Sequence, residues 1–498
     1  MVVTPNAVDP EGAHDDMRRD FGDFRRGVSA VLFGSGARTV ARLTLIFFVV
    51  TYYGVESFGY LGEVAAIVEL SAAFANLGLP KSLFGYLEQH RREGADQGAL
   101  IGEACLATLL TGGLLAAGIW LLWPYIFPTA AGVPAYVAGA IVLIAVTEIL
   151  LTVTRSARLM RWDMMAKGVV KPWGFLLLAA LGYAGGVYAL GWPPVQTLFV
   201  SYLLSLAITG IFAVAGFVMV LRDQHISLRY TSMSKVLQLI RRTFPTALLD
   251  TCSYGYRRLD IIMLGLVAGP AATGVYYLAQ QLATVVEKVR HLFEPMASPI
   301  FAQASSDEHV GHYLRKLCLW IFSIQLGLAL LFLLFTGPVM AVAGAGMVLL
   351  PALFAFVLAA EIMEGGTGLI ELPLIFRRPV LASRNAIIAI TVEILTIVPL
   401  TYLFQGVGAA AGFFCGMLTL SILRLRYARE VLGTRLLNSS YIWPILAAGA
   451  IAGAVLGVMH IVKWPGPVLL AIMISGSLGA YLLFLRAFGI DLKLKPAS

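Results

Sequence analysis

Four arginines lie inside apolar stretches, where a charged side chain is costly. Arg38 and Arg42 stand four residues apart in "SGARTVARLTLIFFVVTYYG", and Arg257 and Arg258 are adjacent in "YGYRRLD". An arginine at the centre of a bilayer costs roughly 2.5–3.5 kcal/mol on the insertion scale, so such residues usually face a bundle interior or an aqueous cavity. Guanidinium is always charged, and its donor fork matches two phosphate oxygens. We therefore expect these four arginines to line a cavity that binds an anion, most naturally a phosphate.

The same arginines have an alternative role as ion-pair partners that hold helices together. Acidic residues on the expected helices supply candidate partners: Glu63, Glu69, Asp250, Asp260, Glu287 and Glu294. Adjacent residues on a helix point about 100° apart, so Arg257 and Arg258 are not expected to face the cavity centre together. The pairing role is a stronger alternative for Arg38 and Arg258 than for Arg42 and Arg257.

Intramembrane carboxylates are candidates for coupling transport to an ion. Several lie in apolar surroundings, where burial disfavours the charged form and suits a proton carrier: Glu148, Glu361, Glu364 and Glu393. We single out Glu63, Asp260, Glu361 and Glu364 as coupling or pairing carboxylates, with an ion pair to arginine as the alternative for each. No cofactor and no metal site is expected, because the four cysteines and seven histidines show no metal-ligand spacing.

The composition places these residues in a membrane protein. Of the 498 residues 59% are hydrophobic and only 13% are charged, and the mean hydropathy is +0.83. Soluble globular domains are about 45–50% apolar and about 25% charged. The polar first 27 residues show no apolar core or cleavage site of a signal peptide, which predicts a short cytoplasmic tail.

Breaking the apolar runs at Gly, Pro and charge clusters predicts an all-α, polytopic fold with about fourteen transmembrane helices. The expected helices span residues 29–53, 56–87, 98–123, 134–154, 169–189, 195–221, 244–267, 272–301, 313–336, 346–372, 379–402, 406–426, 441–462 and 467–487.

The distribution of basic residues tests this count independently. Every second polar segment, beginning with the N-terminal tail, is basic, and these segments hold 31 of the 36 lysines and arginines. The alternate segments are short and hold only Lys463. By the positive-inside rule the basic side is cytoplasmic, so both termini are expected there. The net charge of +8 is then a topology signal, and nucleic acid is not an expected partner.

The two halves of the chain match when one is shifted by 215 residues. The aligned pairs need no gap and are Arg42 with Arg257, Gly54 with Gly269, Gly59 with Gly274, and Pro80 with Pro295. Six helices separate the two copies, so both copies have the same orientation. Parallel repeats of this kind form two bundles related by an axis along the membrane normal, with the substrate bound between them.

These features predict five parts of the chain. They are a cytoplasmic tail (1–27), an N-terminal lobe of six helices (28–222), a cytoplasmic linker (223–243), a C-terminal lobe of six helices (244–428), and two accessory helices with a short cytoplasmic tail (429–498).

Three segments resemble bacterial polysaccharide flippases of the Wzx type. "GVESFGYLGEVAAIVELSAAFANLGLPKSLFGYL" is similar to the first-to-second helix region of that family, and "GPAATGVYYLAQQLA" is similar to its second-lobe counterpart. "FRRPVLASRNAI" followed by "GVGAAAG" resembles the eleventh-to-twelfth helix region. The family belongs to the superfamily that also contains the lipid II flippase and the MATE drug exporters. The resemblance covers most of residues 28 to 430.

The resemblance implies two six-helix bundles in a V that work by alternating access. It implies a polyprenyl-diphosphate-linked oligosaccharide as the substrate, moved from the cytoplasmic to the periplasmic leaflet of a bacterial inner membrane for O-antigen, capsule or exopolysaccharide synthesis. Cavity arginines engage the anionic head group in that family, which matches Arg38, Arg42, Arg257 and Arg258 here. Expected partners are this substrate, membrane lipid and a polysaccharide polymerase complex. No position clearly reproduces a known coupling-ion site.

The alternative function is that of a MATE-like, cation-coupled exporter of small organic molecules. An exporter of organic cations requires an acidic cavity, whereas the mid-membrane arginines favour an anion. A membrane glycosyltransferase or polymerase requires catalytic residues on long outer loops, but the outer loops here are short and nearly uncharged. The sequence also lacks a phosphate-binding Gly-Lys-Ser/Thr loop. We therefore expect a transporter and not an enzyme.

Overall fold

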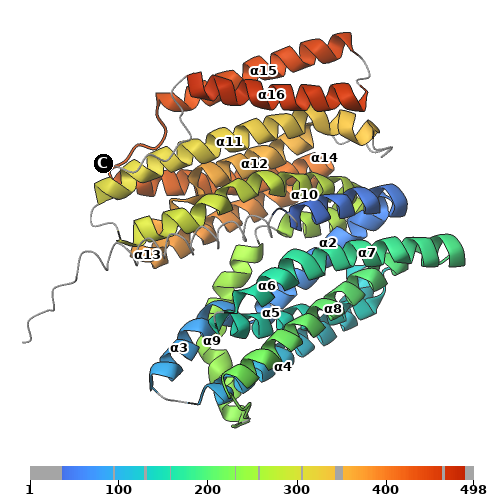
Figure 1. Ribbon diagram of the computed structural model, residues 1–498, viewed down its shortest axis with the longest axis vertical. Helices are drawn as coiled ribbons and strands as arrows, with labels where there is room; N and C mark the ends of the chain where they lie inside the picture. Colours follow the sequence, from blue (N-terminus) through green and yellow to red (C-terminus); the bar gives the residue numbers. More distant parts are fainter. Residues whose placement is uncertain are drawn as a thin grey trace, which may run out of the picture.

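The computed structural model describes residues 36, 38–93, 96–127, 132–157, 159–229, 231–255, 258–303, 307–342, 351–462 and 466–487. All regular secondary structure in these residues is helical, and the long helices run side by side in two groups (Figure 1). In the view of Figure 1, α3 to α8 form the lower group and α10 to α16 the upper group.

The first group begins with a helix that contains residues 38–48 and continues as the π-helix η1 (Val49–Tyr53). The elements that follow are α2 (Val55–Ala75), α3 (Leu79–Glu93), α4 (Gln97–Ile126), η2 (Ala135–Gly139), α5 (Ala140–Ser156), α6 (Met160–Met165), η3 (Ala166–Val170), α7 (Lys171–Leu181), η4 (Gly182–Ala189) and α8 (Pro194–Asp223).

The second group follows α9, which connects the two groups. After α9 (Met233–Gly255), its elements are α10 (Leu259–Gln303), α11 (Asp307–Val342), α12 (Pro351–Gly368), α13 (Glu371–Arg377), α14 (Pro379–Glu430), η5 (Ser439–Tyr441), α15 (Ile442–Ile461) and α16 (Pro467–Ala487). The last two helices pack on α11 and on each other, at the edge of the molecule (Figure 1).

This arrangement confirms the predicted polytopic helical fold. Ten helices within the described ranges are long and apolar enough to cross a membrane. Two of them contain a sharp kink, at Gly269 in α10 and at Gln405 in α14, so that α14 supplies two antiparallel crossings. The expected helix pairs 244–267 with 272–301 and 379–402 with 406–426 meet at these kinks.

The structure differs from the prediction at the expected helix 56–87, which is two helices. The turn Asn76–Gly78 separates α2 from α3, and both Leu77 (φ 53°) and Gly78 (φ 66°) have left-handed backbone. Glycine adopts this conformation at no steric cost, and Pro80 fits the first turn of the new helix. The apolar run continues through the turn, which is why periodicity alone joined the two helices.

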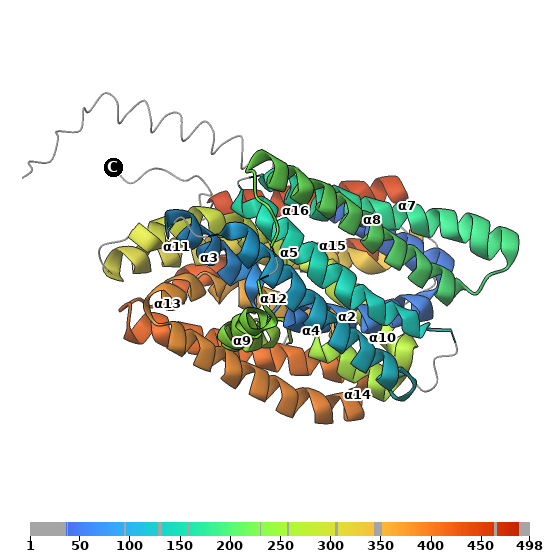
Figure 2. The same cartoon turned by 90° about the horizontal axis from the view of Figure 1, so that it is seen from below.

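The expected helix 244–267 also differs, because α9 begins earlier and ends at Gly255. Although α9 precedes the second lobe, it packs mainly against α2, α3 and α4 of the first lobe, with a smaller contact to α14. By contrast, α10 packs against α11, α12 and α14 of the second lobe and meets the first lobe along α2. In Figure 2 α9 is seen nearly end-on while α4, α5 and α8 run across the view. The helices α9 and α10, although consecutive in the sequence, therefore belong mainly to different lobes.

The two lobes meet most closely where α2 packs against α10, along a contact that we call the glycine seam (Gly59, Gly62 and Gly274 with their neighbours). A Cβ atom on Gly59 would lie 1.8 Å from the carbonyl oxygen of Pro270, and one on Gly274 would lie 2.2 Å from that of Val55. Val55 and Pro270, like the two glycines, are related by the 215-residue shift. The contact is therefore symmetric about the axis that relates the lobes, and only glycine permits this approach.

The seam extends from two glycines with left-handed backbone to an aromatic contact. Gly54 (φ 88°) precedes α2 and Gly269 (φ 79°) forms the kink in α10, at positions again related by 215 residues. At the other end the ring of Tyr277 fills the space at Gly62, where a Cβ atom would lie 2.7 Å from it. The ring of Phe58 lies 4.9 Å from that of Tyr277, centroid to centroid. The lobes are closed here, on the side where the polar segments lack basic residues.

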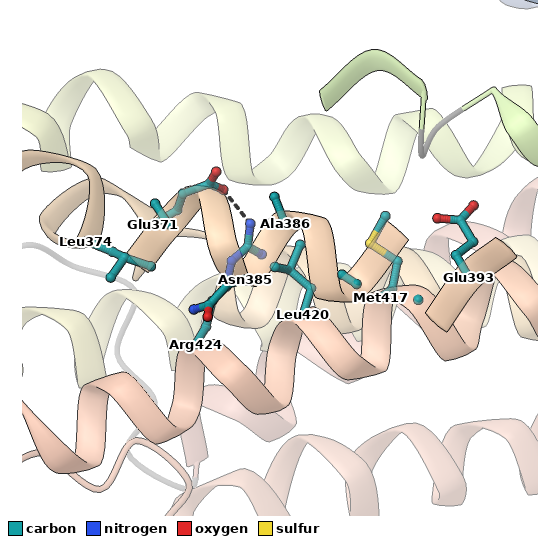
Figure 3. Close-up of a pocket in the computed structure, with 11 residues that line it drawn as sticks. Glu371, Leu374, Asn385, Ala386, Glu393, Met417, Leu420 and Arg424 are labelled. Atoms are coloured by element: carbon teal, nitrogen blue, oxygen red, sulfur yellow. Dashed lines mark hydrogen bonds and ion pairs between the residues drawn. The ribbon is translucent and has the colours of Figure 1, made fainter. Parts of the chain in front are cut away.

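Buried charges hold the second lobe together at its opposite, basic side. Glu364 on α12 lies 3.2 Å from Nε of Arg290 on α10 and 3.4 Å from a guanidinium nitrogen of Arg424 on α14. Arg424 also pairs with Glu371 on α13. Figure 3 shows Arg424 pointing at Glu371 beside a cavity of about 60 Å³, with Glu393 at the far end. We infer that Glu364 serves as a pairing carboxylate, since two buried arginines depend on it.

Replacing Glu364 by alanine should destabilise the second lobe strongly. The side chains of Glu364, Arg290 and Arg424 are only 2%, 9% and 2% exposed, and removing one partner of a buried pair costs about 3–5 kcal/mol. The free energy of unfolding of the purified protein in detergent measures the effect. Glu430→Ala, at the exposed end of α14, is the control, and a loss below about 1 kcal/mol for Glu364→Ala would contradict the inference.

Replacing Gly59 by alanine should hold the seam apart. The added methyl group would lie 1.8 Å from a backbone oxygen, which no side-chain rotation can move, and overpacking costs roughly 1–3 kcal/mol or more. Spin labels at Glu56 and Ala271, both exposed beside the seam, should report a longer distance in the variant. Gly113→Ala on α4, where no atom lies within 4 Å of the added Cβ, should leave the distance unchanged. An unaltered distance in Gly59→Ala would show that the seam is not tight.

Candidate functional site

An ion pair links the two lobes on the basic side of the glycine seam. Arg258, at the start of α10, donates from a guanidinium nitrogen to Oε2 of Glu69 on α2 at 2.8 Å. Glu69 follows Gly59 by ten residues, or about 15 Å along the helix. The two side chains are 23% and 31% exposed. The pair is therefore accessible to a ligand rather than sealed in the packing.

Two further cations surround the carboxylate of Glu69. Arg42, half-buried on the helix of residues 38–48, interacts electrostatically with Arg258, Glu69 and the ring hydroxyl of Tyr277. Lys171, at the start of α7, interacts with Glu69 as well. Helices that are far apart in the sequence thus bring three positive charges to one carboxylate.

The positive charge continues along α10 and the first helix. Lys288 Nζ donates to Thr39 Oγ1 at 2.6 Å, and the ammonium group interacts with Arg42, Arg38 and Glu287. Arg38 is exposed. Arg257, the fourth predicted cavity arginine, lies outside the described residues. We call the described cations the basic cluster (Arg38, Arg42, Lys171, Arg258 and Lys288).

Within the described residues, the charges facing this cluster leave an excess of positive charge. Glu69, Glu287 and Asp260 are the carboxylates that interact with it, against five cations. The hydroxyls of Tyr202 and Tyr277 interact with Glu69 and Arg258 and add neutral hydrogen-bonding groups. Arginine forks and an ammonium group around one point can neutralise an anion with several oxygens, such as a diphosphate.

Glu63 is a carboxylate buried in the glycine seam. It is 6% exposed on α2 and accepts a hydrogen bond from Thr273 Oγ1 at 3.2 Å. Its Oε1 also lies against Gly265, where a Cβ atom would come within 1.9 Å. No lysine or arginine within the described ranges forms an ion pair with it. A charge on Glu63 would be uncompensated while the seam is closed, and separation of the lobes would admit water to it.

The other predicted carboxylates of the second lobe gather around Tyr276. Asp260 is fully buried and accepts hydrogen bonds from the hydroxyl of Tyr276, from Gln280 Nε2 at 2.8 Å and from the Ile261 amide at 2.8 Å. Glu361 and Glu393, 3% and 1% exposed, also interact electrostatically with Tyr276. This acidic group lies inside the lobe and meets the basic cluster at Asp260, which interacts electrostatically with Arg258.

Sequence reasoning counted Lys171 with a basic cytoplasmic segment at the start of the expected helix 169–189, and left Lys288 borderline at the inner end of the expected helix 272–301. In the structure both lysines stand within helices and belong to the basic cluster. The helical segment that carries Lys171 begins at Met160 rather than at residue 169. The positive-inside rule counts a lysine on the cytoplasmic side in the same way whether its ammonium group lies in water or in a cavity. The sequence around a lysine therefore does not distinguish these two positions. For Tyr277, its place at the repeat position of Gly62 was the available signal.

A cavity of about 280 Å³ opens beside Glu69, lined also by Asn76, Glu148, Lys171 and Tyr254. Glu148 is held by Lys167 at 2.8 Å and by Arg155 at 3.1 Å. The arrangement thus combines an accessible basic cluster, an adjoining polar cavity and a closed seam beyond them. Such a site can bind a polar anion without breaking or forming a covalent bond.

Comparison with known proteins places this geometry in a family. A family model described as "Polysaccharide biosynthesis protein" matches residues 25–305, more than half of the chain. No curated protein sequence matches the chain significantly.

Solved structures share the fold at low sequence identity. The lipid II flippase MurJ, in an inward closed conformation, is 12% identical with a TM-score of 0.70, over 93% of this chain and 99% of MurJ. An inward-facing MATE multidrug transporter of the MOP superfamily is 13% identical with a TM-score of 0.59, over 79% and 94% of the two chains. A MOP superfamily transporter from Pyrococcus furiosus is 14% identical with a TM-score of 0.54, over 82% and 94%. The chain thus belongs to the polysaccharide biosynthesis protein family, and it has the multi-pass, two-lobed fold of MOP superfamily transporters.

Proposed function

We propose that the protein is a flippase for a polyprenyl-diphosphate-linked oligosaccharide. It moves this substrate from the cytoplasmic to the periplasmic leaflet of a bacterial inner membrane, for the synthesis of an O-antigen, capsule or exopolysaccharide. Family membership supports a role in polysaccharide biosynthesis. The observation that carries the substrate assignment is the basic cluster, in which Arg42 and Arg258 converge on an accessible carboxylate between the lobes.

The diphosphate binds where Arg42 and Arg258 reach it together. A diphosphate offers several anionic oxygens, and each arginine can engage two of them. The lipid chain stays in the bilayer, while the sugars occupy the polar space next to the cluster. An organic cation, the substrate of the MATE-like alternative, would be repelled by the same charges.

The direction of access follows from the seam and the charge distribution. The basic side is cytoplasmic by the positive-inside rule, which also puts both termini in the cytoplasm. The lobes are closed on the opposite side by Gly59, Gly62 and Tyr277. We infer that this conformation receives substrate from the cytoplasm, and that transport requires the seam to open while the cytoplasmic side closes. A polysaccharide polymerase would take the product on the periplasmic side.

Replacing Arg42 or Arg258 by alanine should abolish polysaccharide export. Each loses charge-assisted hydrogen bonds worth about 1.5–3 kcal/mol, which predicts at least a tenfold fall in complementation of a flippase-deficient strain. Lysine at either position keeps the charge without the fork and should restore part of the activity. Surface polysaccharide and membrane abundance are measured together.

The matched control for these arginines is Arg222→Ala at the end of α8, away from the cluster. Export should remain normal in this variant. If Arg42→Ala and Arg258→Ala insert normally and still export polysaccharide at the unaltered level, the cluster is structural and the proposed substrate is wrong.

We propose Glu63 as the carboxylate that couples transport to protons, because it is buried in the closed seam and reaches water when the seam opens. Glu63→Gln should bind substrate normally but lose most of the dependence of flipping on a proton gradient. Flipping in proteoliposomes, with and without an imposed gradient, measures this. Glu56→Gln, exposed on the same helix, should behave like the unaltered protein. A normal gradient response in Glu63→Gln would move the coupling role to Asp260 or Glu361.

A further inference from the structure

The cavity beside Glu69 has walls from the first lobe and from α9. Glu69 and Asn76 come from α2 and the turn after it, Glu148 from α5, Lys171 from α7 and Tyr254 from α9. Its volume of about 280 Å³ is near the lower end for small-molecule sites. It shares Glu69 and Lys171 with the basic cluster, so a ligand that binds the cluster can extend into it.

Asn76 carries an unused hydrogen-bonding group in this wall. It stands at the break between α2 and α3 and is 7% exposed. Its Oδ1 is buried and has no hydrogen-bond partner within the part of the chain that the structure describes. An unsatisfied buried amide oxygen costs about 1–3 kcal/mol. A ligand in the cavity can remove this cost by offering a donor to the amide.

The charges of the cavity favour a neutral ligand. Each carboxylate already has cations: Glu148 has Lys167 and Arg155, and Glu69 has Arg258. A second phosphate would meet both carboxylates, and an organic cation would meet the lysine and arginines. The remaining requirement is for a molecule with many groups that both donate and accept hydrogen bonds. Sugar hydroxyls do both, and carboxylate, amide and ammonium groups can all engage them.

We propose that this cavity binds the sugar next to the diphosphate of the transported lipid. The inference rests on the proposed function and deepens it, by giving the flippase a sugar-recognition site in its first lobe. Glu69 and Lys171 lie at the boundary between the diphosphate site in the basic cluster and the sugar site in the cavity. Asn76 and Glu148 receive the sugar hydroxyls, and the ring of Tyr254, 55% exposed, covers one face of the sugar.

Binding of synthetic lipids tests this site separately from the diphosphate site. The full-length protein in nanodiscs is titrated with geranylgeranyl diphosphate and with the same lipid diphosphate carrying one hexose or N-acetylhexosamine. We expect at least one sugar to tighten binding by about tenfold, as the net gain from one or two hydrogen bonds predicts. Asn76→Leu, nearly equal in shape, should remove most of this gain and leave the affinity for the bare lipid diphosphate unchanged.

Two further variants keep the outcome clear. Tyr254→Ala changes an exposed residue and should reduce the gain even if Asn76→Leu folds poorly. Asn385→Leu changes a buried asparagine beside the separate cavity of the second lobe and should leave both affinities unchanged.

Failure of the sugar site and failure of the proposed function give different results. If the bare lipid diphosphate binds but no sugar tightens binding, or if the gain survives in both Asn76→Leu and Tyr254→Ala, the sugar site is refuted and the flippase function stands. If the bare lipid diphosphate does not bind, and Arg258→Gln behaves like the unaltered protein, both proposals fail.

Discussion

A charge inside a bilayer requires a partner, and this requirement organises the interior of the molecule. In the second lobe Glu364 satisfies Arg290 and Arg424, and the three residues tie α10, α12 and α14 together. In the first lobe Glu148 does the same for Lys167 and Arg155. Between the lobes the balance differs, because several cations share few carboxylates. The excess positive charge lies where a ligand can reach it. This accessibility distinguishes the candidate binding site from the ion pairs that only hold helices together.

The seam and the basic cluster are joined through Tyr277. Its ring fills the space at Gly62 in the seam, and its hydroxyl faces Arg42, Arg258 and Glu69. Closure of the lobes on one side and the proposed binding of an anion on the other therefore act on the same side chain. The symmetric contacts of Gly59 and Gly274 bring the two backbones into direct contact, so even a small separation of the helices would lose this packing. A tightly packed seam of this kind favours two distinct conformations, closed and open, over a continuous movement between them.

Much of the fold could be predicted from the sequence, because bilayer thickness, positive-inside charge and repeat symmetry each constrain it. The 215-residue shift aligns Gly59 with Gly274, and the structure brings these two residues together. The partners of the buried charges could not be found in this way. Arg258 pairs with Glu69 across 189 positions of the chain, and Arg424 with Glu364 across 60. Apolar periodicity carries no information on which of many glutamates meets an arginine.

The position of Arg258 suits it to link the proposed binding of an anion to a change in the relative position of the lobes. The residue stands where the chain passes from α9, which packs on the first lobe, to α10, which packs in the second. Its partner Glu69 belongs to the first lobe, so any rotation of the lobes changes the distance between the two groups. A ligand shifts a conformational equilibrium only by its difference in affinity for the two states. The anion that we propose to be held by Arg42 and Arg258 together would bind the two states with different affinity, because Arg42 belongs to the first lobe and Arg258 stands at the start of the second.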